Sequence, residues 1–181
     1  MMNKSNIIKQ LDYCIKNEYQ CTIERPLFDE YPIHCLPIKR SEQLVLVHYM
    51  YDFSFDGFKI VRLNDITSLI RSETEMFSEK ICKSERILPP ASPDIDVSDY
   101  KTVFEQFLNK NIEVECEAFE VNTFNIGKVI KVTDKQLEIC RFDALCVWDK
   151  DNTLINIEDI SCVSFGNRYL NILSKHAENG N

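Results

Sequence analysis

The histidines and cysteines are the first candidates for chemistry in this chain, because imidazoles and thiolates bind metals and form nucleophile–base pairs. Only His34 and Cys35 are adjacent, and no CxxC, CxxH or HExxH spacing occurs. The other histidines are His48 and His176, and the other cysteines lie at positions 14, 21, 82, 116, 140, 146 and 162. We therefore expect small buried cysteines typical of a reducing compartment, with no metal site and no Cys–His catalytic pair.

Signatures of cofactor-dependent and serine-dependent enzymes are also missing from the sequence. The four glycines lie at positions 57, 127, 166 and 180, so they form neither GxGxxG nor a P-loop. The nucleophile-elbow pattern GxSxG does not occur either. The sequence therefore predicts a protein that is not an enzyme and that binds no cofactor.

A run of aromatic residues between positions 49 and 58 is a candidate docking surface. Alternation along a strand buries only one face, so several of these rings should lie exposed and available to a protein partner. Packing within the core or between domains is the alternative use of the same rings. The predicted partner-binding residues are Tyr49, Tyr51, Phe53, Phe55, Phe58, Trp148, Asp149 and Asp151.

Charge is distributed unevenly along the 181 residues, whose formal net charge is −8. Residues 1–88 contain 12 Lys and Arg against 13 Asp and Glu, whereas the remainder contains 9 against 16. This balance argues against non-specific binding of nucleic acid or anionic lipid as the main activity. The acidic second half fits a basic partner, and solubilising surface charge is the alternative explanation.

The chain matches itself when it is shifted by 93 or 94 residues. Leu11 then falls on Phe104, and Asp65 falls on Asp159. Apolar positions match through most of a unit of about 85 residues, which indicates a duplication. Three prolines between positions 89 and 93 predict an extended linker. We expect one module at residues 1–87, a linker at 88–95 and a second module at 96–181.

Each module should consist of a helix followed by short strands. Helical apolar spacing predicts helices over residues 5–16 and 98–109, with Ser5 and Ser98 as N-caps. Residues 76–81 and 168–173 have the same spacing and should form a short helix at the end of each module. Alternating or apolar runs predict strands over residues 19–23, 113–119, 127–132, 136–142, 144–148, 153–157 and 161–165.

The two matching aspartates lie between predicted strands. Asp65 and Asp159 could act as acid or base, but each directly precedes an isoleucine between two strands. An aspartate in such a position commonly accepts backbone N–H groups and fixes a turn. We therefore predict a structural role for both. Together these elements indicate a mainly β protein with helices (α+β), built as two tandem, strongly bent β-barrels.

One helix, five bent strands and a short polar turn before the last strand resemble the Sm-like (LSM) fold, a small barrel related in shape to SH3-like barrels. The polar turns are residues 64–66 and 158–160, and Gly127, Asp134 and Glu138 resemble the family's first signature. The resemblance implies RNA binding and association through barrel edges. Glu138 stands where the family has Asn, so no RNA-binding residue is carried over to this chain.

The sequence thus predicts a cytoplasmic, non-catalytic protein that binds another macromolecule, with a protein as the favoured partner. A concrete version is an intracellular inhibitor or immunity protein whose acidic face covers a basic toxin. No apolar run reaches the roughly 20 residues that span a membrane, and no signal peptide is expected. The alternatives are self-association through barrel edges and binding of RNA or single-stranded nucleic acid. The residues predicted for the nucleic-acid alternative are Lys128, Lys131, Lys135 and Arg141.

Overall fold

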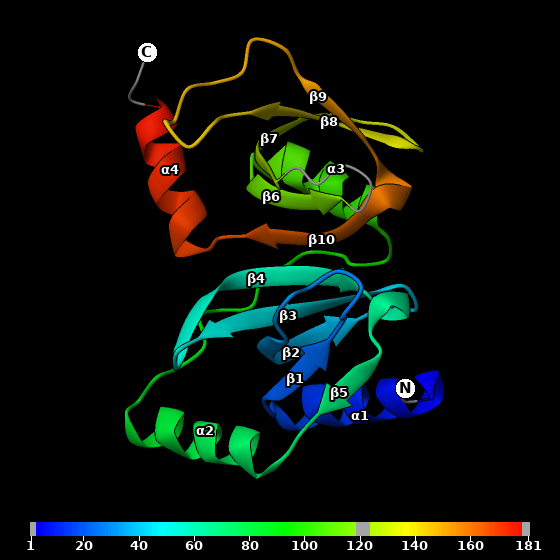
Figure 1. The fold of residues 1–181 in the computed structure, drawn as a ribbon, viewed down its shortest axis with the longest axis vertical. Helices are drawn as coiled ribbons and strands as arrows, with labels where there is room; N and C mark the ends of the chain where they lie inside the picture. The colour runs from blue at the N-terminus through cyan, green and yellow to red at the C-terminus, as the bar shows by residue number, and fades with distance from the viewer. Residues whose placement is uncertain (1–2, 119–123, 179–181) are drawn as a thin grey trace. The chain divides into compact units, whose positions relative to one another are not determined.

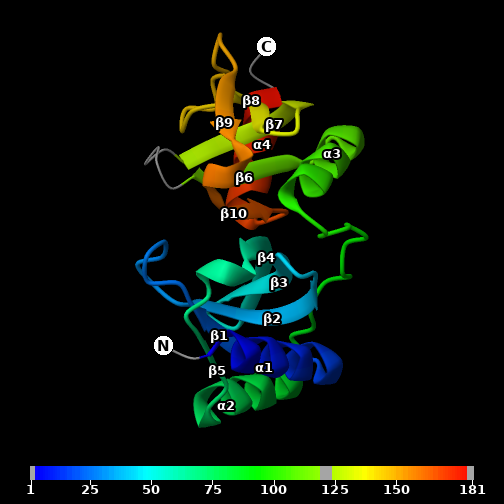
Figure 2. The ribbon, with the colours of Figure 1, turned by 90° about the vertical axis from the view of Figure 1, so that its right-hand side faces the viewer.

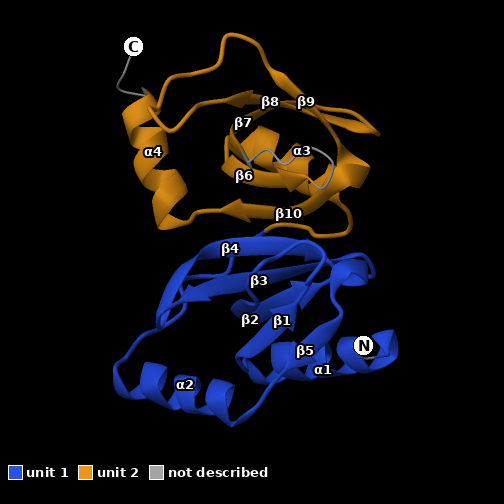
Figure 3. Ribbon diagram, viewed as in Figure 1, with its two compact units in different colours: residues 1–94 blue, residues 95–181 orange. Residues whose placement is uncertain are grey.

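The computed structural model describes residues 3–118 and 124–178, which form two compact units. Unit 1 is Met1–Asp94 and unit 2 is Ile95–Asn181 (Figure 3). Each unit combines helices with an antiparallel sheet, so the expected α+β class is confirmed. Residues 85–99, which include the proline-rich segment, contain no helix or strand.

Unit 1 contains two helices and five strands (Figure 1). The strand order is β5-β1-β2-β3-β4, and every neighbouring pair is antiparallel. A 3₁₀ helix, η1 (Leu63–Asp65), separates β4 from β5. The elements are α1 (Lys4–Asn17), β1 (Cys21–Glu24), β2 (Ile33–Arg40), β3 (Leu44–Tyr51), β4 (Ser54–Arg62), β5 (Ser68–Ile70) and α2 (Glu73–Ser84).

Unit 2 has the same succession of elements. Its strand order is β10-β6-β7-β8-β9, again antiparallel, with the 3₁₀ helix η2 (Ile157–Asp159) before the last strand. The elements are α3 (Tyr100–Lys110), β6 (Glu113–Ala118), β7 (Phe124–Val132), β8 (Gln136–Arg141), β9 (Thr153–Asn156), β10 (Ile160–Phe165) and α4 (Arg168–Glu178). In neither unit does the strand order return to its start, so closure into barrels stays a prediction.

The core of each unit forms where the apolar faces of its elements meet. In unit 1, α1 buries Ile7, Leu11 and Cys14 and packs against β2 and β5. Figure 2 shows α1 and α2 on the same side of the strands of unit 1. In unit 2, α3 buries Phe104 and Phe107 and packs against β7. These faces are the ones that helical spacing predicts.

Both predicted N-caps are wrong by one or two residues. The side chain of Asn3 caps α1 and accepts the backbone N–H of Ser5. In α3 the cap is Asp99, whereas the backbone N–H and hydroxyl of Ser98 both donate to Asp96. Asp99 directly precedes the first helical residue and accepts the backbone N–H of Thr102, whereas Ser98 lies one residue further from the helix.

The predicted strand over residues 144–148 is also wrong. One Asp143 carboxylate oxygen accepts the backbone N–H groups of Leu145 and Val147, which folds the segment into a turn. Cys146 has a positive φ of 62°, and pairing is limited to a bridge between Phe142 and Trp148. Hydrogen bonds to a nearby side chain thus replace the inter-strand hydrogen bonds that the apolar run predicted.

Candidate functional site

Helix α2 is fastened to unit 1 by polar contacts at its N-terminal end. Ser72 and Glu75 form a capping box, in which Glu75 accepts the backbone N–H and the hydroxyl of Ser72. The Thr22 hydroxyl of β1 donates to the other Glu75 oxygen at 2.8 Å. Burial alone raises the pKa of this carboxyl, but the hydrogen bonds from Ser72 and Thr22 outweigh it and lower the pKa. Glu75 is therefore held as a buried carboxylate.

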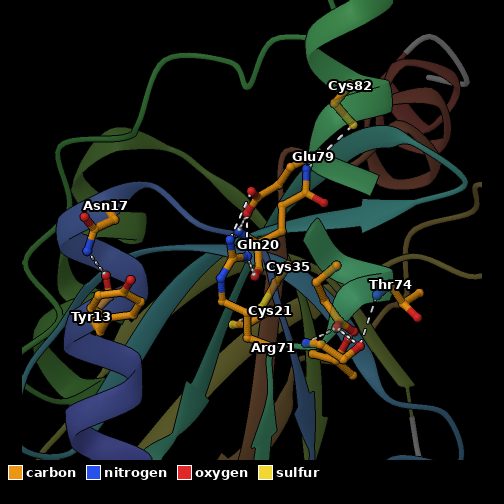
Figure 4. A network of polar contacts seen from close by, with 12 residues as sticks. Tyr13, Asn17, Gln20, Cys21, Cys35, Arg71, Thr74, Glu79 and Cys82 are labelled. Atoms are coloured by element: carbon orange, nitrogen blue, oxygen red, sulfur yellow. Dashed lines mark hydrogen bonds and ion pairs between the residues drawn. The ribbon is translucent and has the colours of Figure 1, made fainter. Parts of the chain in front are cut away.

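A second polar network fastens the C-terminal half of α2 (Figure 4). Glu79 accepts the backbone N–H of Gln20 and both terminal nitrogens of Arg71, with distances of 2.6 to 3.1 Å. Arg71 also donates to the Gln20 carbonyl and lies over the Tyr19 ring. The Gln20 side chain reaches Cys82, the other buried residue of α2 besides Glu75. Polar contacts, rather than burial of an apolar face, thus hold much of this helix.

A pocket of about 270 Å³ lies in unit 1 between these two attachment points. We call it the unit 1 pocket. Its apolar lining comes from Cys21, Cys35, Met50, Phe53, Phe77 and Ile81. Phe77 is 63% exposed and Phe53 is 44% exposed, so two aromatic rings border the opening without being buried by the described part of the chain. A concave apolar surface with exposed aromatic rings is typical of a binding site.

Polar groups complete the lining, and the acidic ones are Asp52 and Glu75. His34 lines the pocket as well, and its Nδ1 lies 2.9 Å from the Thr22 hydroxyl. Because that hydroxyl gives its hydrogen to Glu75, it must accept from His34, which places a hydrogen on Nδ1. The second ring nitrogen of His34 remains the side that can meet a ligand.

Cys21, one of two cysteines in the pocket lining, is a poor nucleophile. The sulfur atoms of Cys21 and Cys35 lie 3.9 Å apart on paired strands. The hydrogen bond between Cys14 and Cys21, together with burial, raises the pKa of the Cys14 thiol. Cys14 lowers the pKa of Cys21, but Cys35 and burial outweigh this and raise it. Thiols with raised pKa values stay protonated near neutral pH and react slowly.

All eight cysteines are free, and no group of three or more potential metal ligands occurs among the described residues.

The aromatic run of β3 and β4 divides into exposed and half-buried rings. Tyr51 and Phe53 are exposed beside the turn between the strands, and Phe53 lines the pocket. Phe55 and Phe58 are half-buried and lie against the buried His48 ring, with centroids 5.5 and 4.8 Å away. Tyr49 is also half-buried, and the Lys59 ammonium lies over its ring.

The turn that carries Phe53 has an unusual backbone. Asp52 and Phe53 both have positive φ values, 44° and 60°, as a two-residue type I′ hairpin turn requires. Asn-Gly suits such a turn, whereas a bulky side chain in the left-handed region is disfavoured. Outliers of this kind cluster at ligand-binding sites, where the surrounding structure sustains them.

The partner-binding residues predicted in unit 2 lie away from the aromatic hairpin in sequence and serve local contacts. Trp148 is half-buried against Ile126 and Phe142, and its indole N–H donates to the Ala177 carbonyl. Asp149 accepts from Arg141, while Asp151 is exposed. Trp148 and Asp149 thus have clear structural roles within unit 2.

The four basic residues predicted for nucleic acid occupy two ends of the β7–β8 hairpin. Lys128 and Arg141 lie at one end, where they pair with Glu113 and Asp149. Lys131 and Lys135 are exposed toward the turn at the other end. The structure does not gather the four into one basic surface.

The two matching aspartates occupy equivalent 3₁₀ helices but make different contacts. Asp159 accepts the side-chain amide of Asn156 at 2.9 Å. Burial raises the pKa of Asp65, opposed by the charges of Arg25 and Arg62. One Asp65 carboxylate oxygen is buried and accepts no hydrogen bond within the described residues.

Sequence reasoning missed the unit 1 pocket as a site. One signal was present, the Ser72-x-x-Glu75 capping pattern that marks the start of α2. The pocket itself depends on segments more than 50 residues apart in the chain, such as Cys21 and Ile81. No local pattern contains such a juxtaposition.

Comparison of the chain with known proteins finds no matching family model, no matching curated protein and no matching solved structure. Among the described helices, none is both long enough and apolar enough to cross a membrane.

Proposed function

We propose that this protein is a non-catalytic binding protein whose unit 1 docks a protein partner. The observation that carries the proposal is the unit 1 pocket with the exposed rings of Phe53 and Phe77 at its edge. Aromatic residues that border a concave apolar surface are the usual anchors of protein interfaces. The protonated thiol of Cys21 in the lining favours binding over catalysis at this pocket.

The charge of the chain supports a basic partner. Among the described residues that line the pocket, the two with a formal charge, Asp52 and Glu75, are acidic. Residues 1–88 contribute only one unit of the overall net charge of −8, so the remainder of the chain would steer a cationic protein toward this one and raise its association rate. At the pocket itself, the negative charge comes from Asp52 and Glu75. An inhibitor or immunity protein for a basic toxin is the concrete form of this proposal.

A duplicated Sm-like fold is our proposal for the architecture. It is supported by the matching succession of one helix, four strands, a 3₁₀ helix, a fifth strand and a final helix in each unit. The equivalent strand orders, β5-β1-β2-β3-β4 and β10-β6-β7-β8-β9, support it further. The eight free cysteines favour a reducing compartment, and we place the protein in the cytoplasm on that ground.

Site-specific photo-crosslinking in the native host tests the docking proposal. A benzoylphenylalanine at Phe53 should capture a defined protein, whereas the same group at the exposed Tyr169 of unit 2 should not. Phe77→Ser should abolish the capture from position 53, since it removes the second exposed ring. Capture that survives Phe77→Ser, or that is equal at both positions, would refute the proposed site.

Nucleic-acid binding is the second candidate, supported by the Sm-like element order and by exposed Lys131 and Lys135. The variant Lys131→Glu with Lys135→Glu should abolish oligonucleotide binding if this candidate is correct. The matched control Lys80→Glu with Lys83→Glu changes exposed lysines of α2 by the same charge. An unmodified protein that binds no oligonucleotide at low salt would eliminate the candidate.

A further inference from the structure

The size and walls of the unit 1 pocket define what can enter it, and this inference rests on the protein-docking function proposed above. Pockets for drug-sized ligands and cofactors usually enclose about 300–1,000 Å³. At about 270 Å³ the unit 1 pocket is smaller than that range. A single large side chain therefore suits it better than a cofactor.

The floor and edge of the pocket favour an apolar side chain. Met50 is buried, and Ile81 is half-buried on the facing helix. Phe53 and Phe77 would lose exposed aromatic area when such a side chain entered between them. Burial of that area provides the driving force, since apolar burial contributes about 25 cal/mol per Å².

The described residues that line the pocket and carry a formal charge are all acidic. Asp52 lies exposed in the hairpin turn and forms no ion pair within the described residues. Glu75 accepts three hydrogen bonds, whereas a carboxylate offers about four acceptor positions. Among the described residues, no lysine or arginine lines the pocket. A phosphate or a nucleic-acid backbone would therefore meet carboxylates without a compensating cation.

We propose that the unit 1 pocket receives one leucine-, methionine- or phenylalanine-sized side chain of the partner, flanked by an arginine or lysine that pairs with Asp52. Asp52 adjoins Phe53 in the same turn, so the anion and the apolar wall are presented together. Charge complementarity thus assigns the occupant as a basic segment of a protein with one apolar anchor.

Short peptides test this assignment on the full chain. The probe is acetyl-Gly-Arg-Leu-Arg-Gly-amide, titrated while the NMR methyl signals of Met50 and Ile81 are recorded. Replacing its leucine by serine should weaken binding at least tenfold, because the anchor is lost. Replacing both arginines by aspartates should also abolish the methyl shifts. Equal binding of the leucine and serine peptides, or of the arginine and aspartate peptides, would overturn the proposal.

Substitutions at exposed residues test peptide binding separately from the stability of the fold. Asp52→Asn should weaken the arginine peptide by about two- to fivefold, the range for an exposed ion pair. Glu158→Gln, the control that removes the same charge at an exposed acidic residue of unit 2, should leave binding unchanged. At Thr74, which is exposed and lines the pocket, Thr74→Arg should weaken binding and Thr74→Glu should strengthen it. The same response from both Thr74 variants would contradict the charge argument.

The two proposals fail in different ways. Capture of a protein from position 53 together with no peptide-induced methyl shift at Met50 or Ile81 would overturn the anchor assignment and leave the docking function intact. Loss of site-specific capture would refute the docking function itself. Leucine-dependent and arginine-dependent shifts would still support the chemistry of the pocket in that case.

Discussion

Mild acid should destabilise unit 1 through His48. This side chain of β3 is 2% exposed, packs against Phe55 and Phe58, and has an Nδ1 without a hydrogen bond in the described residues. Burial lowers its pKa from 6.5 to about 4. The unfolded chain therefore takes up a proton on this ring at a higher pH than the folded chain does. The stability gained from keeping the ring neutral is complete above pH 6.5 and declines as the pH falls toward 4.

The magnitude follows from the two pKa values. One differential proton changes the free energy of unfolding by about 1.4 kcal/mol per pH unit. Linkage between a pKa of 6.5 unfolded and about 4 folded gives a loss of about 2 kcal/mol between pH 7 and pH 5. This is a substantial part of the about 5–15 kcal/mol by which domains are usually stable.

Hydrogen exchange resolved to β3 peptides measures this effect, because the single tryptophan lies in unit 2 and does not report on unit 1. The opening free energy of wild type should fall by about 2 kcal/mol more than that of His48→Leu over the same pH interval. Met50→Leu, at a buried residue of the same strand, changes no titratable group, so it is the control and should keep the wild-type slope. Equal slopes for wild type and His48→Leu would refute the argument.

Three further substitutions test the structure in other places. Phe53→Gly should change the free energy of unfolding by no more than about 1 kcal/mol in urea titrations. Glycine adopts the left-handed backbone of this position without steric strain, which offsets its greater flexibility in the unfolded chain. A larger loss of stability would show that the ring is mainly structural. Glu79→Ala should destabilise α2 by about 1–3 kcal/mol, seen as faster hydrogen exchange of the helix, because it removes the carboxylate that accepts from Arg71 and from the Gln20 backbone N–H. Unchanged exchange would contradict the proposed role of these polar contacts in holding α2. Gly127→Ala should destabilise unit 2 by about 2 kcal/mol or more, because the added Cβ would lie 1.9 Å from the Cys140 carbonyl oxygen. Unfolding of unit 2 can be monitored by tryptophan fluorescence, and a variant as stable as the wild type would refute that close approach.

The sequence was sufficient to predict the helices and strands whose apolar residues recur with the period of one type of secondary structure. Helical spacing placed α1 and α3, and alternation from Glu113 placed β6, because each pattern depends only on which face of the element is buried. The segment at residues 144–148 shows the limit of such patterns. There the Asp143 carboxylate decides the backbone, and an apolar run carries no information about that hydrogen bond.

Only the tertiary structure reveals the pocket at which we propose that a partner binds. The aromatic run was visible in the sequence, but the partial burial of Phe55 and Phe58 against His48 and the exposure of Phe53 depend on how β3 and β4 pack. The unit 1 pocket exists because Glu75 and Glu79 fasten α2 to β1 and to the residue before it, more than 50 positions earlier in the chain. Local periodicity specifies which face of an element is apolar, whereas long-range polar contacts determine which of those faces stays uncovered.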